Sequence, residues 1–523
     1  MAQRETVRPN SYDELPYGST AIPEMHPNRM AVVGRLFGLD PAPVRTCRVL
    51  EIGCAEGGNA IPVAVSLPEA RVVGIDLSER QVAIGNERIS SLGLGNVELV
   101  RADLSELKGE HGTFDYVCAH GVYSWVAPEV QEKLLGACHD LLAPDGIAYV
   151  SYNTQPGWSL QLVLREMARY RARREDGAQR KMAAVRRLLG SVAASAKEAG
   201  GGYRALLAQQ WSTLQGYPDG YLFHDHLEEE NHPCWFHDLA AKAAAAGLTY
   251  VADSLFGATP VAAALPELVS TLEGIAADRI EREQCLDFLT FRTFRQSLFC
   301  RSERTPSAEP DPSVLDRLHV VAQVRPPREA AGLRGEGSVG RTGADGKTLE
   351  TDDPLLKACL AQLWERYPEA VPFTDLARRL AVPGAGGGED GLRVLRQTLL
   401  KGWAGRFVDL LEHVPAYAPR AGERPMASPL ARLQAGRRSG AAISLLHRQL
   451  RLDDLEALVL SRLDGTRDVA ALSRETVEVV LAEGLMRDAE GNTVRDPARV
   501  GAFVERAMGP ILDDLAGAAF LMG

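Results

Sequence analysis

The sequence contains no long hydrophobic run. Among its 523 residues there is no window of about 18 consecutive apolar side chains, and charged side chains occupy the N-terminal stretch where a signal peptide would be apolar. The eight cysteines form no C-x-x-C pair and lie mostly in apolar surroundings, as reduced structural thiols do. We therefore expect no membrane insertion and no disulfide scaffold, and the cytoplasm is the expected location.

The chain also has few basic residues for its size. Lys and Arg number 58 against 69 Asp and Glu, which gives a net charge of −11 and argues against a general nucleic-acid binder. The most basic stretch is a long helical pattern at residues 160–189, with nine Lys or Arg and three acids between positions 165 and 187. A solvated helix face explains this stretch most simply, and a patch for an acidic partner is the alternative.

Composition and length are those of a multidomain globular protein. Apolar residues make up 45% and charged residues 24% of the chain, and 523 residues correspond to about three domains. From residue 47 to residue 153 short apolar runs alternate with helical patterns, which predicts an α/β fold with a doubly wound, largely parallel sheet. The expected strands are residues 48–52, 71–75, 97–101, 114–119 and 147–152.

Two helices between these strands have clear boundaries. One begins after the capping residue Ser78, with Gln81 three positions later, and stops at Gly93. The other follows Pro128 and ends at a turn at residues 144–146.

Changes in composition divide the chain into five parts. An N-terminal extension covers residues 1–45, the sheet domain 46–199 and a mostly helical middle domain 200–310. Residues 311–353 are rich in Gly, Pro and charge and read as a linker with one short strand at 320–324. Residues 354–523 form a last domain of amphipathic helices.

The first expected strand runs into a glycine-rich turn at residues 51–59. Such a turn lets a ligand approach the backbone closely beside a helix N-terminus. Asp76 ends the second strand, where a carboxylate can accept both ribose hydroxyls of a nucleoside, and Asp103 follows the third, within reach of an adenine amino group. Three such positions at neighbouring strand ends predict a nucleoside site.

Glu51 separates two classes of cofactor. The dinucleotide fingerprint G-x-G-x-x-G is not met because Ala55 replaces its second glycine, although a dehydrogenase remains an alternative. A carboxylate at Glu51 would repel a pyrophosphate but suits a cationic amino acid group. Together with the Ala102-Asp103 step and the turn at 142–146, the motif E-x-G-x-x-x-G-G resembles the class I S-adenosylmethionine-dependent methyltransferases.

Further stretches resemble one branch of that class, the proteins with a methyltransferase regulatory domain, which include the rickettsial-type protein lysine methyltransferases acting on outer-membrane protein. The stretches are residues 16–19, 26–27, 114–126, 151–158, 224–236, 294–298 and 463–468. The resemblance covers nearly the whole chain. It implies a Rossmann-like methyltransferase sheet, a regulatory middle domain, a winged-helix-like C-terminal domain, S-adenosylmethionine as cofactor with S-adenosylhomocysteine as product, and no metal.

The resemblance also implies which residues form the cofactor site. The expected set is Tyr17, Glu51, Gly53, Ala55, Gly57, Asp76, Leu77, Asp103, Leu104 and His120. Tyr17 would close over the cofactor as a lid, or else pack on the surface. His120 would flank the cofactor with its backbone, and a role as a base is the alternative. At Ala55, where many members of the family have glycine, the extra methyl group should be tolerated.

Aromatic and amide residues follow the fourth and fifth strands and are the candidates for the catalytic pocket. Tyr123, Trp125 and Trp158 could form its walls, together with Tyr152 at the end of the fifth strand, and Asn153 could orient an amine through its carbonyl. A purely structural role as core residues is the alternative for each. Methyl transfer of this kind needs positioning and exclusion of water rather than a metal.

Four histidines and Cys234 crowd into residues 224–237, which raises the question of zinc. Their spacing fits none of the common structural zinc patterns, so we interpret the stretch as a polar, aromatic surface facing the substrate cleft. The C-terminal domain, residues 354–523, carries 22 basic and 22 acidic residues, which favours docking of protein over nucleic acid.

The sequence thus predicts an S-adenosylmethionine-dependent N-methyltransferase of protein or peptide lysine. An N- or O-methyltransferase of a small metabolite or modified peptide is the alternative among enzymes. A noncatalytic scaffold that binds the cofactor is the alternative from another class.

Overall fold

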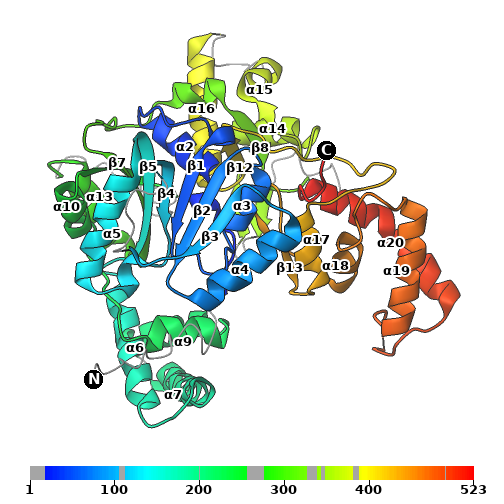
Figure 1. Ribbon diagram of the computed structural model, residues 1–523, viewed down its shortest axis with the longest axis horizontal. Coiled ribbons are helices and arrows are strands. Elements are labelled where there is room, and N and C mark those ends of the chain that lie inside the picture. Colours follow the sequence, from blue (N-terminus) through cyan, green and yellow to red (C-terminus); the bar gives the residue numbers. More distant parts are fainter. Residues whose placement is uncertain are drawn as a thin grey trace, which may run out of the picture.

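The computed structural model describes residues 18–104, 112–199, 201–255, 276–326, 339–342, 348–380, 388–488 and 490–523. A central sheet is covered by helices, a helical bundle lies below it in the view of Figure 1, and the C-terminal helices project to one side. None of the described helices combines the length and apolar character that a membrane span requires.

Seven strands form the central sheet in the order β3-β2-β1-β4-β5-β7-β6. The strands are β1 (Arg48–Ile52), β2 (Arg71–Asp76), β3 (Val97–Arg101), β4 (Phe114–Ala119), β5 (Leu142–Asn153), β6 (Leu248–Asp253) and β7 (Phe294–Arg301). The first five are parallel, whereas β7 pairs antiparallel with both β5 and β6. The expected Rossmann-like sheet is therefore confirmed, and two strands from the expected middle domain complete it.

The five strands predicted from sequence are all present, but the turn predicted at residues 144–146 is wrong. β5 already begins at Leu142, which pairs with Phe114, and the register with β4 shifts between Phe114 and Tyr116. Gly146 makes this close pairing possible, because a Cβ there would lie 2.9 Å from the carbonyl oxygen of Asp115.

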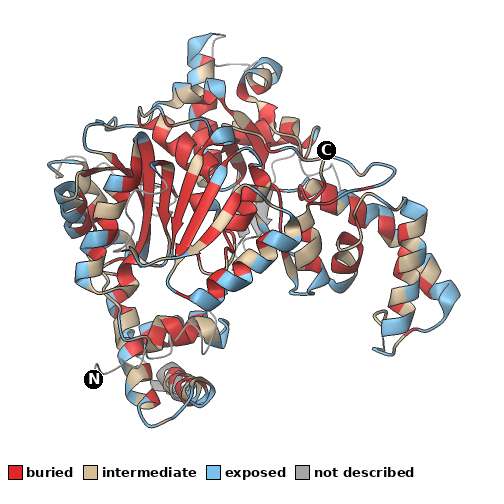
Figure 2. Ribbon diagram, viewed as in Figure 1, coloured by how far each residue is buried: buried red, intermediate tan, exposed pale blue. Residues whose placement is uncertain are grey.

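Helices cover both faces of the sheet, because strands of a parallel sheet are apolar on both sides. The helices are α2 (Pro27–Leu36), α3 (Ala60–Ser66), α4 (Glu79–Leu92), α5 (Pro128–Leu141) and α10 (Phe236–Ala245). Side chains of α2, α3 and α4 belong to one buried cluster and those of α5 and α10 to a second. Figure 2 shows the sheet as the most continuously buried part of the fold.

The boundaries predicted for α4 are confirmed. Ser78 Oγ accepts a hydrogen bond from the Gln81 backbone N–H at 3.2 Å, which caps the first turn. Gly93 ends the helix with φ 65°, in the left-handed region that favours glycine.

A separate bundle follows the fifth strand. Its helices are α6 (Trp158–Ala172), α7 (Ala178–Ala199), α8 (Gly202–Leu214) and α9 (Asp219–Leu227), which share their own buried cluster. The helical pattern predicted over residues 160–189 is interrupted at 173–177, where Gly177 has φ 80°. Arg165 and Arg169 of the basic stretch donate to the backbone carbonyl of Glu228. These two basic side chains therefore form hydrogen bonds within the bundle.

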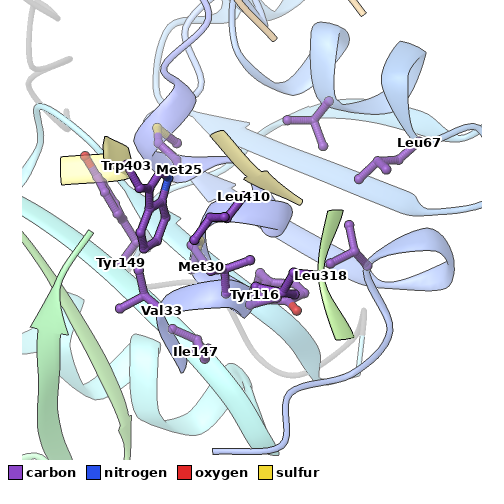
Figure 3. Close-up of a cluster of buried hydrophobic side chains, with 14 of the residues drawn as sticks. Met25, Met30, Val33, Leu67, Tyr116, Ile147, Tyr149, Leu318, Trp403 and Leu410 are labelled. Carbon is purple, nitrogen blue, oxygen red and sulfur yellow. The ribbon is translucent and has the colours of Figure 1, made fainter. Parts of the chain in front are cut away.

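The C-terminal part of the chain divides into two modules with different cores. The first contains β8 (His319–Ala322), α14 (Pro354–Trp364), β11 (Val371–Pro372), α15 (Phe373–Leu380), α16 (Glu389–Ala404) and β12 (Val408–Leu411). Its buried residues merge with the core that α2, α3 and α4 form against the central sheet. Figure 3 shows Trp403 and Leu410 of this module in one cluster with Met30, Val33 and Tyr149.

The second module, which we call the C-terminal module, has its own buried cluster. It contains α17 (Pro429–Gly436), β13 (Ala441–Ile443), β14 (Gln449–Arg451), α18 (Asp454–Leu460), α19 (Val469–Glu483) and α20 (Pro497–Gly517). The short elements of the remaining chain are β9 (Val339–Thr342), β10 (Thr348–Thr351) and the 3-10 helices η1 (Pro23–Met25), η2 (Val44–Thr46), η4 (Tyr123–Trp125) and η5 (Pro312–Arg317).

A buried ion network fixes β6 and β7 to α13 (Arg279–Thr290). The Arg295 side chain of β7 has no exposed surface, lies within 2.8 Å of both Asp253 and Asp287, and reaches Glu283 at 3.0 Å. Its guanidinium also lies 4.1 Å from the ring centroid of Phe236 in α10. One side chain thus joins four elements at the antiparallel edge of the sheet.

We predict that Arg295→Met destabilises the fold strongly. The substitution leaves the carboxylates of Asp253 and Asp287 with only one cation, and breaking a buried pair of this kind costs about 3–5 kcal/mol. Urea unfolding followed by tryptophan fluorescence measures the loss. Arg282→Met, which removes an ion pair to the exposed Glu309, is the matched control and should cost less than about 1 kcal/mol. Equal losses in the two variants would contradict the structural role of Arg295.

Candidate active site

The glycine-rich turn after β1 has an unusual backbone. Gly53, Ala55 and Gly57 have φ values of 76°, 49° and 76°, so three positions in five lie in the left-handed region. Space is also restricted, because a Cβ at Gly53 would lie 2.5 Å from Val122 Cγ2. A Cβ at Gly58 would lie 2.1 Å from Ser19 Oγ. Glycine is therefore required by close packing as well as by backbone conformation.

Ala55 accepts the left-handed conformation because a side chain holds it there. Its backbone N–H donates to Asp76 Oδ2 at 2.9 Å, and Asp76 Oδ1 accepts from the Ser78 backbone N–H at 2.9 Å. A non-glycine residue in this region costs about 1 kcal/mol, which a charge-assisted hydrogen bond offsets. The carboxylate of Asp76 is thus fixed at the end of β2, directly beside the turn.

The residues that follow β2 and β3 lie on the surface at the side of the turn where a nucleoside could bind. Leu77 is 60% exposed, although it is a large apolar side chain next to a buried strand. Asp103 and Leu104 follow the end of β3, and the Ala102 backbone N–H donates to the Asp76 carbonyl at 3.1 Å. Carboxylates at both strand ends with an apolar side chain beside them can hold a ribose and an adenine ring.

Glu51 lies at the buried end of this surface. It is 6% exposed, and Asn59 Nδ2 donates to its Oε2 at 3.2 Å. Burial raises the pKa of Glu51 to about 8, while the hydrogen bond from Asn59 works in the opposite direction. A desolvated carboxyl with few partners is suited to a ligand ammonium group, which would favour its charged form.

His120 follows β4 and is held as a neutral imidazole. Its Nδ1 lies 2.9 Å from Tyr149 Oη, and its ring packs edge-on against Phe294. Burial lowers the pKa of His120 to about 4. Such a group is a poor base for an amine, which favours the predicted flanking role over the alternative.

The aromatic residues predicted for the catalytic pocket come together between η4, β5 and α6. The rings of Tyr123 and Tyr152 meet edge to face with centroids 6.1 Å apart, and those of Trp125 and Trp158 do so at 6.4 Å. The backbone N–H of Asn153 donates to Ser124 Oγ at 2.9 Å, which ties the end of β5 to η4. Residues that are 35 positions apart in sequence thus share one site.

Polar atoms in this pocket are buried without a partner in the part of the chain that the structure describes. They are Tyr123 Oη, Asn153 Nδ2 and Asn231 Nδ2. An unpaired buried polar group costs about 1–3 kcal/mol, so such atoms in a native fold call for an explanation. A polar group of a ligand in the pocket would satisfy them.

Asn231 is a site residue that the sequence did not reveal. Its Oδ1 accepts from Trp158 Nε1 at 3.0 Å, and its neighbour His232 donates a backbone N–H to the Ser124 carbonyl at 2.7 Å. The Cys234 backbone N–H donates to the Asn153 carbonyl at 3.1 Å. Only its position in the stretch 224–236, which carries the family resemblance, could have pointed to Asn231.

Three of the four histidines of residues 224–237 hold separate partners, whereas both ring nitrogens of His226 are buried without a partner among the described residues. His224 Nδ1 lies 2.7 Å from Glu228, His232 Nε2 lies 2.5 Å from Glu230, and His237 Nδ1 lies 3.0 Å from Gln284. No group of three or more side chains suited to a metal ion occurs among the described residues. Tyr17, the expected lid residue, lies outside the described ranges.

Three family models match the chain in series. Residues 49–146 match a methyltransferase domain, 218–301 a predicted methyltransferase regulatory domain, and 423–520 the PKMT C-terminal winged helix domain. The regulatory domain thus contains β6 and β7, and the winged helix domain corresponds to the C-terminal module. A winged-helix C-terminal domain was predicted from sequence and is confirmed.

Proteins from Rickettsia are similar over most of the chain. The uncharacterized protein RP789 of Rickettsia prowazekii is 32% identical over 70% of this chain and 67% of its own, and RP028 is 37% identical over 45% and 93%. The structure of PKMT2 from Rickettsia typhi in complex with AdoHcy superposes with a TM-score of 0.85 at 28% identity, covering 97% of this chain and all of that one. The chain therefore belongs to the family of class I S-adenosylmethionine-dependent methyltransferases with a methyltransferase regulatory domain that includes these rickettsial proteins.

Proposed function

We propose that this methyltransferase methylates the side-chain amine of lysine in a protein or peptide. The observation that carries the proposal is the pocket of aromatic rings and unpartnered polar atoms around Asn153, which adjoins the glycine-rich turn. The similarity to PKMT2 over nearly the whole chain supports the same class of acceptor. The balanced charge of the C-terminal region is compatible with a protein partner.

The cofactor would lie across the carboxyl ends of β1, β2 and β3. In this proposal Glu51 binds its ammonium group, Gly53, Ala55 and Gly57 allow close approach of its amino acid part, and Asp76 accepts from the ribose. Leu77, Asp103, Leu104 and His120 would surround the adenine ring and the centre of the molecule. The buried carboxyl of Glu51 and the left-handed backbone of Ala55 fit such a ligand, since a cation favours the charged form of the first and the second lies in the turn that the ligand would approach.

The acceptor amine would enter between Trp125 and Trp158 and meet Asn153. When bound, the cofactor supplies an electrophilic methyl group on a sulfonium. The rings of Tyr123, Trp125 and Trp158 exclude water, which disfavours the ammonium form of a lysine whose ordinary pKa is about 10.4. Asn153, through its carbonyl Oδ1, and the Tyr123 hydroxyl oxygen accept hydrogen bonds from the amine N–H groups and so leave the nitrogen lone pair directed at the methyl group.

We also propose that the reaction takes place in the cytoplasm. All eight cysteines are free, and six of them are buried. Reduced structural thiols are typical of that compartment.

Removal of the Glu51 charge should weaken cofactor binding and stabilise the cofactor-free protein. The folded-state pKa of about 8 exceeds the ordinary 4.5, so the free energy of unfolding falls as pH rises from about 4.5 to 8. Glu51→Gln abolishes this loss and should raise the free energy of unfolding by about 1–3 kcal/mol at pH 8. Affinity for S-adenosylhomocysteine should fall about 10- to 100-fold, as for a lost charged hydrogen bond. Calorimetric titration and thermal unfolding measure the two effects.

Glu98→Gln provides the matched control for that experiment. Glu98 lies on β3 and pairs with Arg71 on the exposed side of the sheet, so neither property should change appreciably. A Glu51→Gln protein that is less stable and binds S-adenosylhomocysteine normally would contradict the proposed role of Glu51.

Methyl groups should appear on lysine when the enzyme is given bacterial protein extract and methyl-labelled S-adenosylmethionine. Asn153→Ala should lower kcat about 100-fold, because misplacement of a reacting atom by about 1 Å has an effect of that size. Tyr123→Phe should lower kcat up to about tenfold, as for one lost hydrogen bond. Amino acid analysis after acid hydrolysis identifies the methylated residue, and intact-mass spectra of lysine peptides give the rates.

Tyr152→Phe is the control for hydroxyl removal beside the pocket. The Tyr152 hydroxyl lies 2.9 Å from Ser297 Oγ, so its loss should affect stability and leave kcat nearly unchanged. Label in small metabolites, or in base-labile methyl esters, would refute lysine as the acceptor. Cofactor binding without label in any product would favour a scaffold.

A further inference from the structure

A loop of the C-terminal module reaches the glycine-rich turn of the sheet domain. The loop joins β13 to β14, and its His447 is 2% exposed, with Nε2 at 2.8 Å from Asn59 Oδ1. His447 has φ 57°, a left-handed conformation that residues other than glycine seldom adopt. The buried imidazole of His447, on a strained backbone in the C-terminal module, thus lies at the start of α3.

The hydrogen-bond partners of Asn59 determine which of its atoms faces which group. The Ile22 backbone N–H, which can only donate, lies 3.0 Å from one atom of the amide, so that atom is Oδ1. Nδ2 therefore faces Glu51 Oε2 at 3.2 Å. His447 must then donate its Nε2–H to Oδ1, and burial supports the neutral tautomer by lowering the pKa of His447 well below its usual value.

Further contacts hold the N-terminal segment between the turn and the loop. Ser19 Oγ accepts from the Gly58 backbone N–H at 2.9 Å, and Thr20 Oγ1 donates to Gln449 Oε1 at 2.9 Å. The rings of His26 and His447 lie 4.8 Å apart. Three distant parts of the chain therefore meet at Asn59.

We propose that the C-terminal module completes the cofactor site, with His447 as a positioning residue that holds Asn59, and through it Glu51, in the geometry that receives the cofactor's ammonium group. The inference rests on the role proposed for Glu51 above. It gives the module a part in methyl transfer that does not depend on the identity of the acceptor.

The physical basis is the orientation of one amide. With His447 in place, two donors face Oδ1 of Asn59, and the amide nitrogen is left for the carboxylate. Without it, one of the two donors is lost and the amide is free to turn its oxygen toward Glu51, which would place two acceptors against each other. The carboxyl would then lose the hydrogen bond that favours its charged form.

Coupling between the module and the cofactor is reciprocal. If His447 improves cofactor binding through Glu51, a bound cofactor must stabilise the docking of the loop by the same factor. A merely structural His447 would support the fold without regard to the charge at Glu51. This difference provides the test.

The experiment is a double-mutant cycle on the full-length protein, read as the dissociation constant for S-adenosylhomocysteine. His447→Asn tolerates the left-handed backbone but is too short to reach Asn59, and it should weaken binding about tenfold, which corresponds to about 1.4 kcal/mol. The same substitution in the Glu51→Gln background should have little further effect. His447→Gln, whose amide can donate at a similar reach, should restore most of the affinity.

Steady-state kinetics separate positioning from general damage. His447→Asn should raise KM for S-adenosylmethionine and leave both kcat and KM for the acceptor peptide nearly unchanged. His139→Asn is the matched control and should change none of these values, because this partly buried histidine of α5 pairs with Asp140 and has no hydrogen bond to Asn59 or His447 within the described part of the chain. If His447→Asn does not fold, His447→Gly, which suits the left-handed backbone and removes the imidazole while leaving both partners of the Asn59–Glu51 hydrogen bond unaltered, replaces it in the cycle.

The outcomes distinguish this inference from the proposed function. Equal weakening by His447→Asn in both backgrounds, or none in either, would overturn the inference and leave the role of Glu51 intact. Unchanged affinity in Glu51→Gln alone would overturn the role of Glu51 and the inference with it.

Discussion

The desolvated carboxyl of Glu51 is the constraint on which the arrangement of the whole site depends. A carboxyl at the buried end of a central strand loses its hydration. Burial, together with the charge of Asp76, raises the pKa of Glu51 to about 8 against the opposing hydrogen bond from Asn59. Asn59 donates a hydrogen bond to this carboxyl, and Asn59 is itself held by the N-terminal segment and by His447 of the C-terminal module. The need to orient one amide therefore brings together parts of the chain that are nearly 400 positions apart. In the proposed function, the cationic ammonium group of the cofactor supplies the remaining compensation.

The proposed binding site for the lysine depends on a second set of contacts between parts of the chain that are distant in sequence. The regulatory segment provides β6 and β7 to the sheet, and the ion network of Arg295 fixes these strands to α13. Between the bundle and α10 the same segment passes over the pocket, where His232 and Cys234 bond to the backbone of Ser124 and Asn153. The proposed catalytic site consequently combines residues of the methyltransferase domain with residues of the regulatory segment. The domain boundary predicted from the sequence at residue 199 therefore divides a single sheet, because β1–β5 lie before it and β6 and β7 after it.

Features encoded locally were predictable, and pairing over long distances was not. Ser78 and Gly93 mark α4 because caps depend on a few neighbouring residues, and strand ends place Glu51 and Asp76 at one edge of the sheet. Periodicity does not identify the partner of a strand, so the places of β6 and β7 did not follow from it. The extension of β5 to Leu142 depends on a register shift opposite Phe114, which is a property of the pair. Asn59, Asn231 and His447 carry no spacing signal, because each acts through residues far away in sequence.

The two halves of the site have different energetic roles. Glu51 is proposed to contact the ammonium group of the cofactor, which has the same charge before and after methyl transfer. A contact of equal strength in substrate, transition state and product lowers KM without raising kcat. The acceptor nitrogen, in contrast, changes from a neutral amine to a cation as the methyl group arrives. In the proposed site, the aromatic faces of Tyr123, Trp125 and Trp158 would interact more strongly with the developing cation than with the amine, so their contribution would affect kcat. The C-terminal module contacts Asn59 through His447 and the N-terminal segment through Gln449, so in the proposed arrangement it acts on the binding half, and changes in its docking would alter cofactor affinity rather than the chemical step.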